Sequence, residues 1–255
     1  MFTSHSRRAL KVFFILMAKI LRSCSTDTMI TLSKGNNGRS SYALNRPTTI
    51  SSWHPEHEAL PWTEVSTFEQ LKHGCRQNGG GKFRITASFK FPRHITINGG
   101  NKENSSQAVH VTISGAVSPP STAHGKQRFV FDGQNRTNFF SVRNNASLLV
   151  LDMEFTNGHS VLGGAVSLLR GSRAAFTGVT FTRCHSAVDG GAIRSKESTL
   201  IIENSAFSQC TSHFYGGGVS LISNPTVHMR SIIFEQTEAR LAGGGIHVAG
   251  AKVLK

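Results

Sequence analysis

Acidic side chains are scarce in this sequence. The 255 residues contain 14 Asp and Glu against 28 Lys and Arg, which gives a formal net charge of +14 at pH 7. This excess fits a negatively charged partner, such as an acidic or sulfated polysaccharide or an anionic membrane surface, while a basic surface without a special partner is the alternative. Nucleic acid is not expected, because basic clusters interleaved with exposed aromatic residues and known nucleic-acid-reading motifs are missing.

Cysteine, tryptophan and tyrosine are rare as well. The four cysteines, Cys24, Cys75, Cys184 and Cys210, lack further ligands at the short spacings of a zinc site, and we predict neither a metal nor another cofactor. Seventeen Phe stand against two Trp and two Tyr, and Phe side chains, which have no polar group, suit interior stacks. The apolar run Val12–Ala18 is too short to cross a bilayer, so no membrane-spanning segment is predicted.

A repeat occupies residues 148–255. A Gly-Gly pair followed by a small and a β-branched residue starts at Gly163, Gly190, Gly216 and Gly243, so the period is 26–27 residues. A phenylalanine recurs in the same register, at Phe155, Phe181, Phe207 and Phe234. Three positions later come Gly158, Cys184, Cys210 and Thr237, and five positions later come Ser160, Ser186, Ser212 and Ala239.

The residues before each phenylalanine alternate in polarity, which predicts strands rather than helices. The apolar alternate positions are Leu148/Val150, Ala174/Phe176, Leu200/Ile202 and Val227/Met229. One such unit cannot bury its apolar side chains alone, so successive copies must stack as parallel strands about 4.8 Å apart. We therefore expect columns of Phe, of small or Cys, and of Ser or Ala residues inside the coil, with the glycine pairs (Gly163–Gly164, Gly190–Gly191, Gly216–Gly217, Gly243–Gly244) at a corner.

These motifs resemble a known repeat. The segments Gly163–Val166, Gly190–Ile193, Gly216–Val219 and Gly243–Ile246 are similar to the GGAI motif of the polymorphic outer membrane protein repeat, which is paired with Phe-x-x-Asn. Here Cys184 and Cys210 replace that Asn after Phe181 and Phe207. The resemblance implies an all-β fold, a right-handed parallel β-helix of the pectate-lyase-like superfamily. It does not imply an enzyme, because many members are non-catalytic surface proteins.

Three segments are predicted along the chain. Residues 1–25 have a basic start and a short apolar core, which fits a secretory signal poorly and leaves a transit peptide or misread non-coding sequence as alternatives. Residues 26–62 form a polar linker without apolar periodicity. Residues 63–255 form the β-helix. The chain stops soon after the last repeat without a capping segment, which favours a fragment truncated at its C-terminal end, since an uncapped edge is a liability.

A short helix is predicted over Thr63–Gly74. Ser66 and Glu69 have the spacing of a capping box, and Gly74 stops the helix. Such a helix covers the open end of the first turn. Irregular turns follow, with short strands and two corner insertions; the strands are Phe83–Ala87, His94–Ile97, Val109–Ser114, Phe129–Phe131 and Phe139–Val142, and the insertions are Asn101–Gln107 and Ser118–Lys126. Glycosylation acceptor triplets begin at Asn104, Asn135 and Asn145 and matter only in a eukaryotic secretory route.

Cys184 and Cys210 are one turn apart in the same column. Their expected Cα separation falls within disulfide range. In-register side chains point the same way, however, which strains a bridge, so two buried thiols are the favoured interpretation.

Candidate catalytic carboxylates are isolated. Asp152 and Glu154 should share one face of a strand, but the same columns on other turns bring no second acid. Asp189, beside Gly190, has Leu162, Tyr215 and Ala242 as turn neighbours, so the paired carboxylates of glycoside hydrolysis are missing. His159 and His185 should stack, in an exposed structural role or as a pH-sensitive or sugar-contacting pair. No catalytic residue is therefore assigned.

Two functions remain open. The first is a non-catalytic β-helix, secreted or at a cell surface, that binds acidic polysaccharides or cell-surface proteins in adhesion, because repeats give repeated weak contacts. The alternative is a polysaccharide lyase or glycoside hydrolase of the same superfamily. The oligomeric state does not follow from the sequence.

Overall fold

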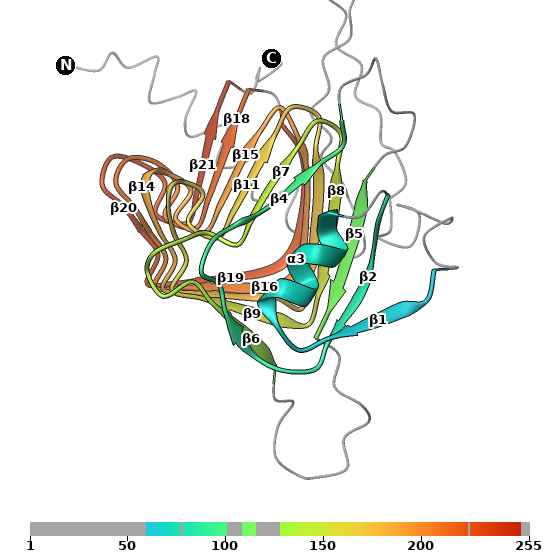
Figure 1. Cartoon of the computed structure of the whole chain (residues 1–255). Helices are drawn as coiled ribbons and strands as arrows, with labels where there is room; N and C mark the ends of the chain where they lie inside the picture. The colour runs from blue at the N-terminus through green and yellow to red at the C-terminus, as the bar shows by residue number, and fades with distance from the viewer. Residues whose placement is uncertain (1–59, 77–78, 101–108, 116–127, 224, 251–255) are drawn as a thin grey trace, which may run out of the picture.

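The chain is a parallel β-solenoid of about six turns, seen in a computed structural model (Figure 1). The structure describes residues 60–76, 79–100, 109–115, 128–223 and 225–250. Every strand pairing among these residues is parallel, and strands of successive turns lie side by side in three sheets. The all-β, solenoid part of the sequence-based prediction is confirmed.

Sheet A has eleven strands and forms two walls of the coil. Its first wall contains β1 (Trp62–Val65), β2 (Gly80–Ile85), β5 (His110–Ser114), β8 (Ser147–Leu151) and β12 (Arg173–Thr177). Its second wall contains β3 (Phe89–Lys90), β6 (Phe129–Asp132), β9 (Met153–Thr156) and β13 (Thr180–Thr182). The strands β16 (Thr199–Ser208) and β19 (Thr226–Glu235) run through both walls, which joins them into one sheet.

Sheets B and C complete each turn. Sheet B contains β4 (Ile95–Asn98), β7 (Phe140–Arg143), β11 (Val166–Leu169), β15 (Ile193–Lys196), β18 (Val219–Ile222) and β21 (Ile246–Ala249). Sheet C contains β10 (His159–Leu162), β14 (His185–Asp189), β17 (Thr211–Ser212) and β20 (Glu238–Ala239). Sheet C occurs only in the last four turns, and Figure 1 shows its strands on stacked loops that project beside sheet B.

The predicted apolar columns form the core. Leu148, Ala174, Leu200 and Val227 pair from turn to turn, and so do Val150, Phe176, Ile202 and Met229. The three Phe rings Phe155, Phe181 and Phe207 are fully buried and stack at centroid distances of 5.4 and 4.9 Å, and Phe234 continues the stack at 4.9 Å. Identical residues on successive turns thus meet face to face, as the repeat predicts.

The glycine pairs make a corner, and their two members do different things. The first glycines, Gly163, Gly190, Gly216 and Gly243, have φ between +66° and +72°. The second glycines leave room for the next turn: a Cβ on Gly191 would lie 1.9 Å from the backbone oxygen of Gly217. The first position therefore needs glycine for its dihedral angle and the second for the close approach of two backbones.

At two other corners, residues that are mostly not glycine adopt the left-handed backbone conformation. The sequence did not predict these corners. Between the walls of sheet A, Asp152, Gly178, Asn204 and Ser231 all have positive φ. At the end of the second wall, Asn157, Arg183, Gln209 and Gln236 have φ near +50°. Asn and Asp tolerate positive φ better than most residues, but Arg and Gln have no such preference. The corner at the end of the second wall is therefore imposed by the stacking of turns.

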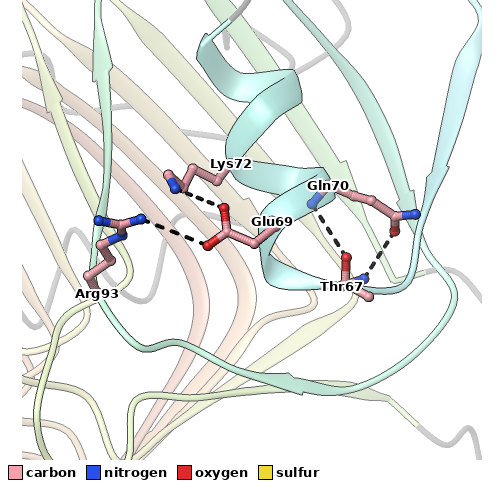
Figure 2. Close-up of polar contacts among 5 residues, drawn as sticks. All are labelled: Thr67, Glu69, Gln70, Lys72 and Arg93. Carbon is pink, nitrogen blue, oxygen red and sulfur yellow. Dashed lines mark hydrogen bonds and ion pairs between the residues drawn. The ribbon is translucent and has the colours of Figure 1, made fainter.

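The N-terminal helix differs from the prediction in its bounds and cap. Residues 63–65, expected to start the helix, belong to β1 (Trp62–Val65), and α3 spans Phe68–Arg76. The capping box is Thr67 with Gln70, rather than Ser66 with Glu69: the Gln70 N–H donates to Thr67 Oγ1 (3.4 Å), and Gln70 Oε1 accepts from the Thr67 N–H (3.2 Å) (Figure 2). Glu69 instead pairs with Lys72 and lies 3.9 Å from Arg93.

The helix covers the open end of the coil, as predicted (Figure 1). Phe68, Leu71 and Cys75 are buried and belong to the same core as the strands, and the Phe68 ring meets Phe91 at 5.1 Å. Gly74 does not stop the helix, which continues to Arg76. A Cβ at position 74 would lie 2.3 Å from the Phe83 ring. Glycine at this position lets the helix approach the first turn closely.

The short strands predicted in the irregular turns are present as β2, β4, β5, β6 and β7, with ends shifted by at most three residues. The segment 1–25, most of the 26–62 linker, and the whole of both corner insertions lie outside the described residues. The domain boundaries therefore stay predictions.

Candidate functional site: the stacked arm

The stacked loops that carry sheet C form the most distinctive surface of the described residues. We call residues 159–163, 185–190, 211–216 and 238–243 the arm. The chain leaves the coil after Gly158 and returns at Gly164, since a Cβ on Gly158 would lie 2.4 Å from the Gly164 oxygen. Glycine at position 158 therefore allows the neck of the first loop to close, while Cys184, Cys210 and Thr237 occupy this position in the later loops.

The Ser column lies inside the arm and not in the main apolar core. Ser186 is fully buried, and its hydroxyl lies 2.9 Å from the carbonyl oxygens of Val161 and Asp189. Ser212 is buried in the same column on the next turn. The Ser186 hydroxyl thus bonds to carbonyls inside its narrow loop, whereas the Ser212 hydroxyl has no partner and the last turn has Ala239, so small size is the property that the column shares.

The outer side of the arm exposes large apolar side chains on three of its four turns. Val161 is 62% exposed, Leu241 59% and Phe214 38%. The Phe214 N–H donates to the Val188 carbonyl and the Leu241 N–H donates to the Phe214 carbonyl, both at 3.0 Å, so Val188, Phe214 and Leu241 lie one above another. Exposed apolar side chains that gather in one place often mark interaction surfaces.

Basic and aromatic groups flank this apolar column. Arg240 Nη1 lies 3.3 Å from His213 Nε2, and the His213 ring packs against Phe214 at 4.9 Å. Nearer the neck, the predicted stack of His159 and His185 is confirmed, with ring centroids 5.1 Å apart. Burial lowers the pKa of His185, and the neighbouring His159 and His213 lower it further.

Two facing columns enclose a polar layer between the arm and sheet B. The arm column contains Leu162, Asp189, Tyr215 and Ala242, in the register expected from the sequence. The facing column of sheet B contains Ser167, Arg194, Ser220 and His247. The glycine corner joins the two columns, and across it the Tyr215 and His247 rings stack at 4.4 Å. We call Asp189, Arg194, Tyr215, Ser220 and His247 the polar layer.

Several atoms of the polar layer are buried without a hydrogen-bond partner. They are Asp189 Oδ1, Arg194 Nε, Ser220 Oγ and His247 Nδ1. Arg194 is only 9% exposed and Ser220 is fully buried. Buried polar groups are normally paired, and atoms outside the layer, such as Arg143 Nε and Ser147 Oγ, are also buried without a partner.

Burial also controls the ionisation of the layer. Desolvation raises the pKa of Asp189, while the nearby charges of Arg194 and His247 act in the opposite direction. Desolvation lowers the pKa of Arg194, and Asp189 opposes this. The layer therefore brings an arginine and a carboxyl group near each other beside two aromatic rings.

Asp189 is a candidate from the sequence, but its neighbours in the layer are not. Arg194 and His247 come from the facing column, whereas the repeat relates Asp189 only to residues of its own column. The signal was available, because Arg194 follows Asp189 by five residues across a glycine corner that must turn back.

The remaining candidates lie apart from this site. Asp152 occupies a left-handed corner before β9, so it does not share a strand face with Glu154 as expected. Cys184 and Cys210 are buried free thiols, as the favoured interpretation predicted, and burial raises the pKa of Cys184. Asn135 and Asn145 are exposed at turns, Asn104 lies outside the described residues, and glycosylation stays a prediction.

In the part of the chain that the structure describes, no group of three metal-ligating side chains occurs, and no helix is long and apolar enough to cross a membrane. The fold defines the class of the protein, a parallel β-solenoid with a projecting stacked arm. No protein-family model, curated protein or solved structure matched the chain.

Proposed function

We propose that this chain is a non-catalytic adhesion protein, secreted or displayed at a cell surface, that binds acidic polysaccharides through the outer side of its arm. The proposal includes the right-handed coil and the polymorphic outer membrane protein-type repeat suggested by the glycine motifs. The observation that carries it is the exposed column of the arm, where Phe214 and Leu241 are stacked beside His213 and Arg240.

The chemistry of this column suits a sugar chain. Aromatic and apolar side chains pack against the apolar faces of sugar rings, and basic groups attract carboxylates or sulfates. The net charge of +14 favours an anionic partner over a neutral one. Since the arm repeats its backbone on each turn, a long polymer can make several weak contacts at once, which raises its overall affinity. A cell-surface protein is the alternative partner.

The first test is binding of the full-length protein to neutral, carboxylated and sulfated polysaccharides at low and high salt, with product analysis. The proposal predicts salt-sensitive binding of the acidic polymers and no new reducing ends or unsaturated sugars. Binding to none of the polymers would contradict it, and capture by a cell-surface protein alone would replace the polysaccharide with the alternative partner.

A pair of matched variants locates the contact. Leu241→Ser removes an apolar side chain that is 59% exposed on the arm, and Ile233→Ser removes one that is 64% exposed in sheet A. Leu241→Ser should weaken polymer binding several-fold, while Ile233→Ser should leave it unchanged. Equal effects of the two substitutions would mean that the arm is not the contact surface.

A second function, a polysaccharide lyase, is favoured by one observation. Elimination beside a uronate carboxylate needs a cation to neutralise the carboxylate and a base to remove a proton, and the polar layer holds Arg194, Tyr215 and His247 on three successive turns. Unsaturated products that disappear in His247→Gln would favour the lyase over the adhesion protein.

A further inference from the structure

We propose that Trp62, Lys82 and Arg84 form a second binding site, for an anionic sugar unit, at the end of the coil that α3 covers. The site lies on the outer face of β1 and β2, whereas the arm belongs to the last four turns (Figure 1). The inference rests on the proposed function only in its choice of an acidic polysaccharide as the source of the ligand.

Positive charge is concentrated at this end of the coil. We call residues 60–76 and 79–100 the capped end. The capped end contains six Lys and Arg against two Glu, a net charge of +4, whereas residues 128–223 and 225–250 contain ten Lys and Arg against eight Asp and Glu, a net charge of +2. The capped end is less than half as long as those other residues together, so it attracts an anionic ligand more strongly than they do.

The register of two strands brings an aromatic ring and two cations together. Trp62 of β1 pairs with Lys82 of β2. Phe83, between Lys82 and Arg84, is buried in the core, so its two neighbours lie on the outer face of the wall with Trp62. Lys82 Nζ lies 4.8 Å and Arg84 Cζ 5.6 Å from the centroid of the Trp62 ring. Two positive charges therefore share one aromatic ring.

The two cations suit an anionic group of the ligand. Arg84 is exposed, and among the described residues it meets the Trp62 ring without forming a hydrogen bond or an ion pair. A guanidinium held over an aromatic ring keeps its N–H groups, which lie in its own plane, available to a carboxylate or sulfate. Lys82 adds a second positive charge beside the same ring. An anion between the two side chains also relieves the repulsion between their charges.

Trp62 gives the site a surface for the sugar ring. The residue is half-buried, and β1 is the terminal strand of sheet A, so part of the indole is open to a ligand. The apolar face of a sugar ring packs against an aromatic side chain, and the indole N–H can donate to a hydroxyl group. A ligand that carries both a sugar ring and an anionic group thus uses all three side chains, whereas a neutral sugar or a simple anion uses only some of them.

Two other anionic partners fit the site less well. A lipid surface binds helices and anchors that present a broad apolar face, and Leu60, 41% exposed, is the only exposed large apolar side chain of the capped end as the structure describes it. Single-stranded nucleic acid stacks its bases on several aromatic side chains in series. Trp62 has no such series beside it, because the Phe rings of the described capped end belong to the core or pack against it.

The test uses the fluorescence of Trp62. The sequence contains two Trp, so Trp53→Phe leaves Trp62 as the single tryptophan of the full-length protein. A sulfated chondroitin disaccharide, which carries a carboxylate and a sulfate, should change the Trp62 emission in a saturable titration. Lactose lacks the anions and inorganic sulfate lacks the ring, so each should bind at least about tenfold more weakly. No saturable change with the disaccharide, or equal binding of lactose or inorganic sulfate, would overturn the proposal.

Two further probes distinguish the classes of partner. Vesicles that contain phosphatidylserine and a single-stranded oligothymidylate should leave the Trp62 emission unchanged at concentrations of anionic groups at which the disaccharide saturates. A stronger response to the vesicles would assign the site to a lipid surface, and a stronger response to the oligonucleotide would assign it to nucleic acid. Either result would overturn the sugar assignment.

Substitutions identify the residues. In the Trp53→Phe background, Arg84→Gln and Lys82→Gln should each weaken disaccharide binding at least about fivefold. Arg93→Gln is the matched control, because it removes the same charge from a side chain of the capped end that is 62% exposed, and it should change the affinity less than about twofold. Circular dichroism checks that each variant is folded.

The variants decide between a site and a diffuse charge effect. If Arg84→Gln fails to fold, Lys82→Gln still tests the site. Unchanged binding in either folded variant would contradict the proposal, and an equal loss in Arg93→Gln would show that only the overall charge of the capped end matters.

The two proposals can fail separately. If acidic polymers bind and Leu241→Ser weakens them, but the disaccharide leaves the Trp62 emission unchanged, the arm function stands and the Trp62 site is wrong. If the disaccharide binds at Trp62 while Leu241→Ser has no effect on polymer binding, the Trp62 site stands and the arm is not the contact surface.

Discussion

The second glycine of each pair offers the sharpest test of the stacking geometry. In Gly191→Ala, the new Cβ would lie 1.9 Å from the Gly217 oxygen and 2.7 Å from the Thr211 oxygen. Both obstacles are backbone atoms of the next turn, so relief requires the two turns to move apart and to weaken their hydrogen bonds. Overpacking typically costs 1–3 kcal/mol, and a backbone obstacle places this site at the upper end, so we expect a loss of about 3 kcal/mol or more.

Gly244→Ala is the matched control, because Gly244 has the same motif position in the last described turn. Its Cβ would meet only the Thr237 oxygen, at 3.0 Å. Alanine also reduces the entropy of the unfolded chain, so the free energy of unfolding should stay within about 1 kcal/mol of the original protein. Urea unfolding followed by circular dichroism measures both. Equal losses in the two variants, or a loss below about 1 kcal/mol in Gly191→Ala, would refute contact between turns as the reason for the second glycine.

Three further predictions concern the helix cap, the histidine stack and the thiols. Gln70→Ala removes the reciprocal cap of α3 and should lower the free energy of unfolding by about 1 kcal/mol in urea titrations. The lowered pKa of His185 means that the folded state binds fewer protons than the unfolded state below pH 6.5. The contribution of His185 to stability is therefore present above pH 6.5 and is lost as the pH falls below that value. His185→Gln should flatten this dependence in unfolding curves measured from about pH 7.5 to about pH 5. In a Cys24→Ser background, Cys75 and Cys184 should react with a thiol reagent only after unfolding, because burial raises their pKa.

Each of these has a contrary result. If Glu69→Ala, which breaks only exposed ion pairs, destabilised the protein as much as Gln70→Ala, the cap would not be the source of the effect. A stability that fell with rising pH between 5 and 6.5 would contradict the predicted direction of the histidine effect. An unchanged pH dependence in His185→Gln would contradict its assignment to His185. Rapid labelling of Cys184 in the native protein would show that the Cys column is accessible.

The regular turns were predictable because each column repeats a residue type with one physical role. Phe155, Phe181 and Phe207 mark the interior, and Gly190 with Gly191 marks the corner, so periodicity alone places them. The left-handed corner at Arg183 was not predictable, because arginine has no preference for positive φ and takes it only under the constraint of the stacked turns.

The candidate site was harder to predict than the fold. A repeat shows which residues lie above one another, but it does not show which columns face each other. The pairing of Tyr215 with His247 depends on how far the arm folds back beside sheet B, which no local propensity encodes. The helix cap was misplaced for a similar reason: Ser66–Glu69 and Thr67–Gln70 both fit the motif, and the pairing of β1 with β2 decides between them.

Hydrogen–deuterium exchange of the full-length protein, with and without bound polygalacturonate, tests the central claim that the arm is the binding surface. The account predicts slower exchange upon binding in residues 159–163, 185–190, 211–216 and 238–243, with little change in the second wall of sheet A. Protection confined to sheet A, or uniform protection across the coil, would contradict it.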